Sequence, residues 1–285
     1  MDREQASAAG RKERLQAHLL EVARERDPDR APAGHAHVAD YIRRALARQG
    51  APARHRFDYR DRRHENIVLD LPGRSAGGFI LVGAHYDGVP GSPGADDNGS
   101  AIAVLLELAS EFAAEPAPRP LRLVAFDLEE RDLVGSRAYA ADLHRSREPL
   151  HLMIALEMLG YCDPRPGSQR YPPGLRYFYP DRGDFIGLIG NLRAIPPMRR
   201  LARALRRSVP CEWLPVPGRG HLLPDTRRSD HSPFWDLGYP ALMVTDTANL
   251  RNPHYHSDGD RLETLDMDFL TGVCTGLIAG LRALA

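Results

Sequence analysis

The amino-acid sequence predicts an α/β sandwich, and three of its features lead to that prediction. Runs of five or six apolar residues, the first of them Phe79–Gly83, have the pattern of strands buried on both faces. These runs alternate with longer segments whose apolar residues recur at helical spacing. With 285 residues and 42% hydrophobic side chains, the chain can bury one sizeable core.

The elements before residue 100 come from periodicity and from residues that break it. Two Arg-rich helices are expected at 11–26 and 35–49, and Gly50 ends the second one. Phe57 and Tyr59 alternate with charged residues as in an edge strand, and 66–71 is a second strand candidate. Pro72-Gly73 then turns the chain into the strand that begins at Phe79.

The second half of the chain continues the alternation. After a helix at 101–112, strands are predicted at 121–126, 151–156, 185–189 and 239–244, and helices at 135–143, 198–208 and 266–284. The segments 161–183 and 210–228 are rich in Pro and Gly, so both are expected to be long loops. No repeat or linker divides the chain. We therefore expect a single domain over 1–285, with N-terminal helices at about 11–49 and a core at about 65–285.

Composition excludes several classes of function. The net charge is zero, so neither nucleic acid nor an anionic membrane is an expected partner. No run of about 18 apolar residues exists to span a membrane, and the first 16 residues lack the apolar run of a signal peptide. The cysteines, Cys162, Cys211 and Cys274, form no C-x-x-C pair. Reduced thiols in a cytoplasmic protein are the expected outcome.

Acidic and imidazole side chains gather where three successive strands end. His85 and Asp87 follow the first strand, Glu129 and Glu130 the second, and Glu157 the third. Because the carboxyl ends of neighbouring parallel strands converge, these groups should face one another. So many carboxylates in one cleft would repel and take up protons. A divalent cation is the simplest compensation, and the imidazole favours zinc.

Two further segments complete this cluster. Asp96-Asp97 stand at the start of the helix that follows the first strand, where a Gly- and Pro-rich loop ends. Near the C-terminal end, Asn252-Pro253-His254-Tyr255-His256 forms a loop before the closing helix. A His in such a loop is most often an ordinary loop residue. Beside a cleft that is rich in carboxylates and short of nitrogen ligands, His256 becomes a plausible second imidazole ligand.

The ordered set HYD, GADDNGS, LEE, ALEM and YHSDGD resembles the co-catalytic zinc aminopeptidases related to bacterial leucyl aminopeptidase, family 28 of the metallopeptidases. The resemblance covers about residues 65–285. It implies a three-layer α/β/α sandwich around a central mixed, mostly parallel sheet. It also implies two zinc ions per chain and hydrolysis of the N-terminal peptide bond of a peptide or aminoacyl substrate with a free N-terminus.

The resemblance carries a role to each matching position. His85 and Glu157 would bind one zinc, Glu130 and His256 the other, and Asp97 would bridge the two. Two further residues have catalytic roles: Asp87 would orient the His85 ring, and Glu129 would act as general base. Glu157 is also a candidate to hold the ammonium group of the substrate. Many members of the family have Asp at that position, and the longer Glu can alter metal spacing.

Other interpretations stay open beside this one. A glutaminyl cyclase-like enzyme would use one zinc for acyl transfer without water, and a relative without activity would keep the fold as a binding module. Gly73–Gly77 matches G-x-S-x-G, but a strand follows it instead of a helix, so a turn is expected. Asp230-His231 is expected to be a structural pair or a pair that supports metal ligands, in preference to a third metal site. His221, in the Pro-rich loop, is a candidate substrate contact or simply a solvated side chain.

Overall fold

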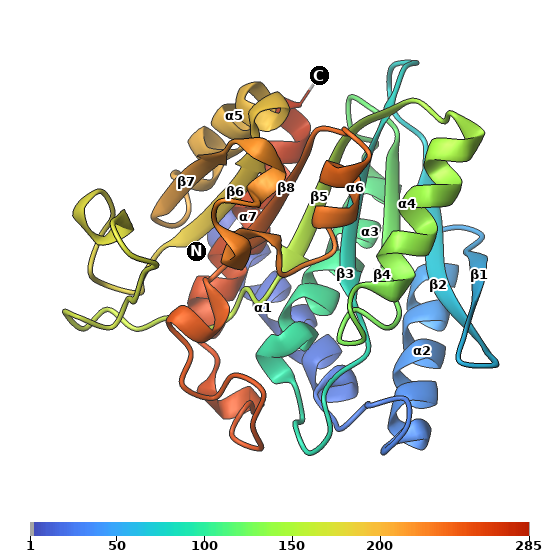
Figure 1. Ribbon diagram of the computed structural model, residues 1–285, viewed down its shortest axis with the longest axis horizontal. Coiled ribbons are helices and arrows are strands. Elements are labelled where there is room, and N and C mark those ends of the chain that lie inside the picture. Colours follow the sequence, from blue (N-terminus) through green and yellow to red (C-terminus); the bar gives the residue numbers. More distant parts are fainter. Residues whose placement is uncertain (1–2, 285) are drawn as a thin grey trace.

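The computed structural model describes residues 3–284, which fold around one eight-stranded sheet (Figure 1). Its strands, in chain order, are β1 (Ala53–Tyr59), β2 (Arg62–Leu71), β3 (Phe79–His85), β4 (Leu121–Phe126), β5 (Leu150–Glu157), β6 (Ile186–Asn191), β7 (Cys211–Val216) and β8 (Ala241–Thr245). Their order in the sheet is β1-β2-β4-β3-β5-β8-β6-β7.

Parallel pairing dominates the middle of the sheet. The neighbours β4, β3, β5 and β8 all run in the same direction, and β6 pairs with β7 in parallel. The antiparallel pairs are β1–β2, β2–β4 and β6–β8. The prediction of a mixed, mostly parallel sheet is therefore confirmed.

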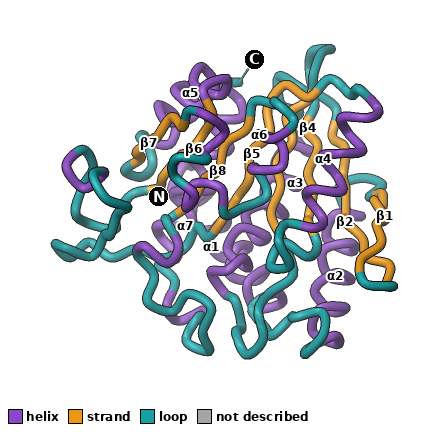
Figure 2. The backbone as a smooth tube through the Cα atoms, in the orientation of Figure 1, coloured by secondary structure: helices purple, strands orange, loops and turns teal. Residues whose placement is uncertain are grey.

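Helices cover both faces of the sheet, which gives three layers (Figure 2). One face carries α1 (Arg3–Val22), α2 (Pro32–Ala47), α3 (Ala101–Ala114), α5 (Ile195–Leu205) and α7 (Met267–Ala283). The other carries α4 (Val134–Ser146) and the short α6 (Ser232–Asp236). Alternation along the strands explains the two apolar cores. In β3, Ile80 and Val82 join the first core, whereas Phe79 and Leu81 join the second.

The sequence-based elements agree with the structure except in two regions. The segment 210–228, predicted to be a loop, contains β7, and the short helix α6 was not predicted. The helix expected from residue 11 begins at Arg3 and ends at Val22, before Asp27-Pro28. The helix expected at 198–208 begins earlier, at Ile195, because Pro196 and Pro197 fit the first turn of a helix. Within 3–284, no helix has the length and apolar character needed to cross a bilayer.

Candidate metal centre

The predicted cluster lies at the carboxyl edge of the parallel block. His85 is the last residue of β3, and Glu157 is the last residue of β5. Glu129 and Glu130 follow β4 after a two-residue link. Because β3 lies between β4 and β5, these three chain segments meet at one edge, as the sequence predicted.

Asp97 lies between two groups of potential ligands. Its Oδ1 is 3.3 Å from His85 Nε2, and its Oδ2 is 3.1 Å from His256 Nε2. Glu157 Oε1 is 3.7 Å from His85 Nε2, and Glu130 Oε1 is 3.4 Å from His256 Nε2. The structure thus forms two three-residue groups, His85–Asp97–Glu157 and Asp97–Glu130–His256, that share Asp97. All five ligand candidates from the sequence come together here.

The donor set fits zinc. Three atoms of these residues are buried without a hydrogen-bond partner in the described structure: His85 Nε2, Asp97 Oδ1 and Glu130 Oε1. Burying polar atoms without partners is costly, so a bound cation would relieve that cost. Ligands about 2.0–2.2 Å from a tetrahedral zinc lie roughly 3.4 Å from one another, close to the separations within the two groups. A third combination, His85 with Glu129 and Glu130, shows that Glu129 faces the same space.

Asp87 makes more contacts than the sequence suggested. Its Oδ1 lies 3.4 Å from His85 Nδ1, which suits the predicted orientation of the ring. The same carboxylate accepts hydrogen bonds from the backbone N–H groups of Glu129, at 3.0 Å, and Glu130, at 3.1 Å. One fully buried side chain therefore positions a potential ligand of one group and the backbone of the other.

Asp96, although adjacent to Asp97, points into the protein interior. Its carboxylate accepts hydrogen bonds from Gly160 N at 2.8 Å, Ser100 Oγ at 3.0 Å and Asn252 Nδ2 at 2.9 Å. These three hydrogen bonds hold the segments beneath the centre together. Of the Asp96-Asp97 pair, only Asp97 reaches the two histidines.

The charges of these groups depend strongly on one another. Although burial alone would lower the pKa of His85, the carboxylates of Glu129 and Glu157 raise it well above its ordinary value. Burial also opposes protonation of His256, but Asp97 and Glu130 raise its pKa to about 10. Burial, with Glu157 and Glu130 nearby, raises the pKa of Glu129 well above the usual range for a carboxyl. A cation binding here would therefore displace protons from the imidazoles.

Ser229 contacts Glu157, and sequence reasoning had not singled it out. The buried Ser229 hydroxyl donates a hydrogen bond of 2.7 Å to Glu157 Oε2, which leaves Oε1 facing His85. Ser229 is 72 residues away in the chain, and no local pattern marks this contact. The Glu157 side chain, one methylene longer than Asp, is thus held by a hydrogen bond to its Oε2.

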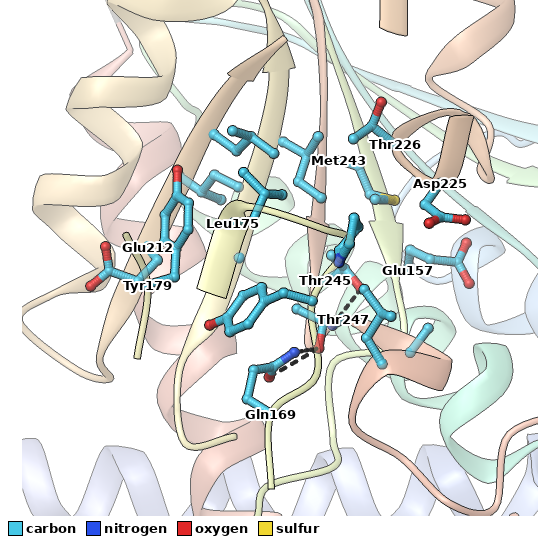
Figure 3. Close-up of a pocket in the computed structure, with 18 of the residues that line it drawn as sticks. Glu157, Gln169, Leu175, Tyr179, Glu212, Asp225, Thr226, Met243, Thr245 and Thr247 are labelled. Atoms are coloured by element: carbon cyan, nitrogen blue, oxygen red, sulfur yellow. Dashed lines mark hydrogen bonds between the residues drawn. The ribbon is translucent and has the colours of Figure 1, made fainter. Parts of the chain in front are cut away.

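An apolar cavity of about 110 Å³ opens beside Glu157 (Figure 3). Glu157 lies at one end of it and Tyr179 at the other. Most of its walls are apolar or aromatic side chains from β6, β7, β8 and the loop 161–183, among them Tyr171, Leu175, Tyr179, Phe185, Leu188, Ile189, Trp213, Leu214 and Met243. The segments 161–183 and 210–228, which were predicted to be loops, thus supply part of the pocket wall.

Of the remaining predicted residues, His221 lies outside the cavity lining, whereas the buried Asp230 interacts electrostatically with His85 and Glu157 of the centre. His221 is exposed and is not among the residues that line the cavity, so the structure gives no support to a substrate contact there. Asp230 and His231 are buried, and neither belongs to a ligand group among the described residues. Burial lowers the pKa of His231 to about 4, and its Nε2 donates a hydrogen bond of 2.8 Å to the Thr226 carbonyl.

Comparison with known proteins places the chain in a family. The family profile described as Peptidase family M28 matches residues 66–179. The uncharacterized protein YfbL of Escherichia coli strain K12 is 40% identical over 229 residues, which are 75% of this chain and 69% of YfbL. Leucine aminopeptidase 1 of Arthroderma gypseum is 27% identical over 72% of this chain, and this chain spans about half of it (54%).

Solved structures show the same fold. The LapA aminopeptidase of Legionella pneumophila superposes with a TM-score of 0.75 at 17% identity, covering 100% of this chain and 76% of LapA. Tannerella forsythia glutaminyl cyclase gives a TM-score of 0.68 at 19% identity, covering 98% of this chain and 99% of the cyclase. The predictions of the fold and of the metallo-aminopeptidase family are therefore confirmed: this chain belongs to peptidase family M28.

Proposed function

We propose that this chain is a zinc-dependent aminopeptidase that hydrolyses the N-terminal peptide bond of its substrate, with Glu129 as general base. The observation that carries the proposal is the pair of ligand groups that share Asp97. Five ligands exceed what one four-coordinate zinc can use while keeping a position for water. Two zinc ions per chain, with Asp97 between them, use all five residues.

Bound at these groups, zinc would polarise the scissile carbonyl and lower the pKa of a water molecule toward neutrality. The position of Glu129 beside the ligand groups supports its role as the base, since its Oε2 lies 3.9 Å from His85 Nε2. Burial, the main cause of the raised pKa of Glu129, makes this carboxylate a stronger base, which suits a group that takes a proton and then passes it to the leaving amine. Asp87 holds the backbone of Glu129 so that the carboxylate stays in place.

The cavity gives the substrate its orientation. Glu157 lies at the mouth of an apolar pocket and could receive the substrate ammonium through a charge-assisted hydrogen bond. The first side chain would then enter the pocket, whose volume of about 110 Å³ approaches that of a cavity known to hold benzene, about 150 Å³. Leucyl and similar apolar N-terminal residues are therefore the proposed substrates.

Paired measurements on the purified protein test this proposal. We expect about two zinc ions per chain, and cleavage of leucyl anilide but not of its N-acetyl form. Charge-assisted hydrogen bonds worth roughly 1.5–3 kcal/mol correspond to at least tenfold discrimination against the blocked substrate. Full activity after chelation, with no metal detected, would overturn the proposal. Equal turnover of the two substrates would contradict the aminopeptidase assignment but would leave the metal centre unaffected.

Acyl transfer is the second candidate. The superposition with the glutaminyl cyclase covers 98% of this chain and 99% of the cyclase. Incubation with a peptide that begins with Gln separates the two reactions, because cyclisation releases ammonia and hydrolysis releases free Gln. One zinc per chain together with ammonia release would favour the cyclase.

A further inference from the structure

Arg26, in the connection between α1 and α2, is a buried cation without an acidic partner. It is 1% exposed, and within residues 3–284 its guanidinium forms no ion pair. Its two terminal nitrogens bind backbone carbonyls instead, whereas its Nε is buried without a partner in the described structure. Nη1 lies 3.1 Å from the Val22 oxygen, 3.2 Å from that of Arg24 and 2.7 Å from that of Pro93. Nη2 lies 2.8 Å from the Gly94 oxygen and 2.9 Å from that of Asp97.

These contacts join the N-terminal segment to the loop that carries the shared ligand. Three of the five carbonyls that Arg26 binds, those of Pro93, Gly94 and Asp97, belong to the loop that leads into α3. The carbonyl of Asp97 is held on one side by Arg26, while its carboxylate lies between the two histidines. The position of the shared carboxylate therefore depends on a residue more than seventy positions earlier.

Two glycines make room for this side chain. A Cβ added at Gly94, which has φ +58°, would lie 2.8 Å from both Arg26 Nη1 and Nη2. A Cβ added at Gly88 would lie 3.3 Å from Arg26 Cγ. The Gly-rich loop that the sequence shows between His85 and Asp97 is thus shaped in part to admit a guanidinium.

The charge of Arg26 also acts on the metal centre. Burial lowers the pKa of Arg26, and the carboxylates of Asp97, Asp260 and Asp87 oppose that shift, so its charge interacts with acidic groups in and around the centre. A fixed positive charge behind several carboxylates reduces their mutual repulsion. This holds whether or not the cleft contains a cation.

The next residue, Asp27, also lies in the α1–α2 connection, and it pairs with a residue beside the second ligand group. Asp27 is fully buried, and its Oδ2 pairs with Arg131 Nη2 at 2.6 Å. Arg131 directly follows Glu130. Two consecutive residues of the α1–α2 connection thus contact the segments that carry Asp97 and Glu130: Arg26 binds the Asp97 carbonyl, and Asp27 pairs with Arg131.

We propose that the α1–α2 connection is part of the metal centre and that Arg26 is its main positioning residue, holding Asp97 for metal binding. The proposal rests on the metal centre described above and adds a role for a segment outside residues 66–179, where the family profile matches. It concerns metal affinity and geometry, and it requires no particular substrate.

The test compares four forms of the full chain: wild type, Arg26→Met, Arg26→Lys and Arg24→Met. Met keeps the length of the side chain without donors or charge. Lys keeps the charge but has its three donors on one nitrogen, whereas Arg26 reaches the five carbonyls from two nitrogens. Arg24 is the matched control, because its side chain is 38% exposed and its contacts, with the Leu20 and Glu21 carbonyls and the Glu21 carboxylate, all lie at the end of α1. Zinc affinity is measured by competition with a chelator, and geometry by the visible spectrum of the cobalt-substituted protein.

We expect Arg26→Met to bind zinc at least tenfold more weakly at one site and to change the cobalt spectrum, because residues supporting metal ligands typically contribute 10–100-fold to affinity. Arg26→Lys should be intermediate, and Arg24→Met should match wild type. Circular dichroism in chelator checks folding; if Arg26→Met fails to fold, Arg26→Lys decides. Wild-type affinity and spectrum in a folded Arg26 variant would overturn the proposal, even with a lower melting temperature. Metal binding without peptidase activity in the wild type would contradict only the proposed function.

Discussion

Glu129 and Glu130 are adjacent in the chain, but their carboxylates face different imidazoles. We predict that Glu129→Gln, which removes the basic carboxylate but keeps its size, retains both zinc ions while kcat falls by about 10²–10⁴. Glu130→Gln should instead lose zinc, because it removes an anionic ligand. Metal analysis beside steady-state kinetics checks both variants. If the two variants behaved alike, the assignment of Glu129 as base and Glu130 as ligand would be wrong.

His231 provides a prediction about pH and stability. Its folded pKa of about 4 lies below the unfolded value of about 6.5, so protons bind preferentially to the unfolded chain as the pH falls below 6.5. Between pH 7 and pH 5 this one group should lower the free energy of unfolding by about 2 kcal/mol. Urea unfolding of wild type and His231→Gln in chelator measures the difference. Equal losses in the two proteins would contradict it.

At the scale of single residues, the ligand candidates were predictable from the sequence, but the residues that contact them from distant parts of the chain were not. His85, Asp97, Glu130, Glu157 and His256 sit at strand ends or in motifs whose order can be read from the chain. Ser229 and Arg26 act through contacts with residues about seventy positions away. An Arg in an Arg-rich segment looks like a surface charge until the fold shows that it is buried.

At the scale of elements, β6 offers a test of the proposed substrate pocket. Gly187 lines the cavity, and an added Cβ would meet no atom closer than 3.3 Å. We predict that Gly187→Ala lowers kcat/KM for leucyl relative to alanyl substrates by about tenfold, since one methylene in an apolar pocket changes discrimination 10–200-fold. Zinc content should not change.

The matched control lies on the same strand. Gly190 faces α5, where an added Cβ would meet Met198 Sδ at 3.0 Å. Gly190→Ala should therefore lower the melting temperature without altering the ratio of leucyl to alanyl cleavage. A similar change of ratio in both variants would mean that the pocket is not the site that selects the side chain.

The elements that sequence analysis missed have identifiable causes. β7 contains Pro215 and follows Pro210, which made the segment look like a loop, but β7 is an edge strand, where a residue without an N–H group is tolerated. α6 is only five residues long and has Pro in its first turn. α6 is too short for helical periodicity to show, whereas β7 was missed because of its prolines and not because of its length. The long buried strands and α3, by contrast, were predicted to within a few residues.

At the scale of the whole molecule, removing the metal should weaken the fold. The buried atoms without partners and the crowded carboxylates become favourable only when a cation joins them. Zinc at a hundred times its dissociation constant should add about 2.7 kcal/mol of stability per site and raise the melting temperature by about 5 °C. Thermal unfolding with zinc and with excess chelator checks this. Identical curves would mean that the clusters bind no metal.

Some whole-molecule expectations stay predictions. The three cysteines are free thiols, which is compatible with the expected cytoplasmic location but does not test it. The single-domain prediction and the expected absence of nucleic-acid and membrane partners also stay predictions. Each concerns the protein in its cell or in solution, and sequence patterns address these only through composition.

The position of β8 between β5 and β6 has a consequence for synthesis on the ribosome. Until residues 241–245 emerge, β6 and β7 have no bond to the other five strands, and the edge of β5 that carries Glu157 is unpaired. His256 is made later still. A growing chain, released at roughly 5–20 residues per second, thus holds four of the five proposed metal ligands for some time without a complete centre. Hydrolytic activity would begin only when the sheet closes, so a ribosome-bound intermediate could not cleave the N-termini of neighbouring nascent chains.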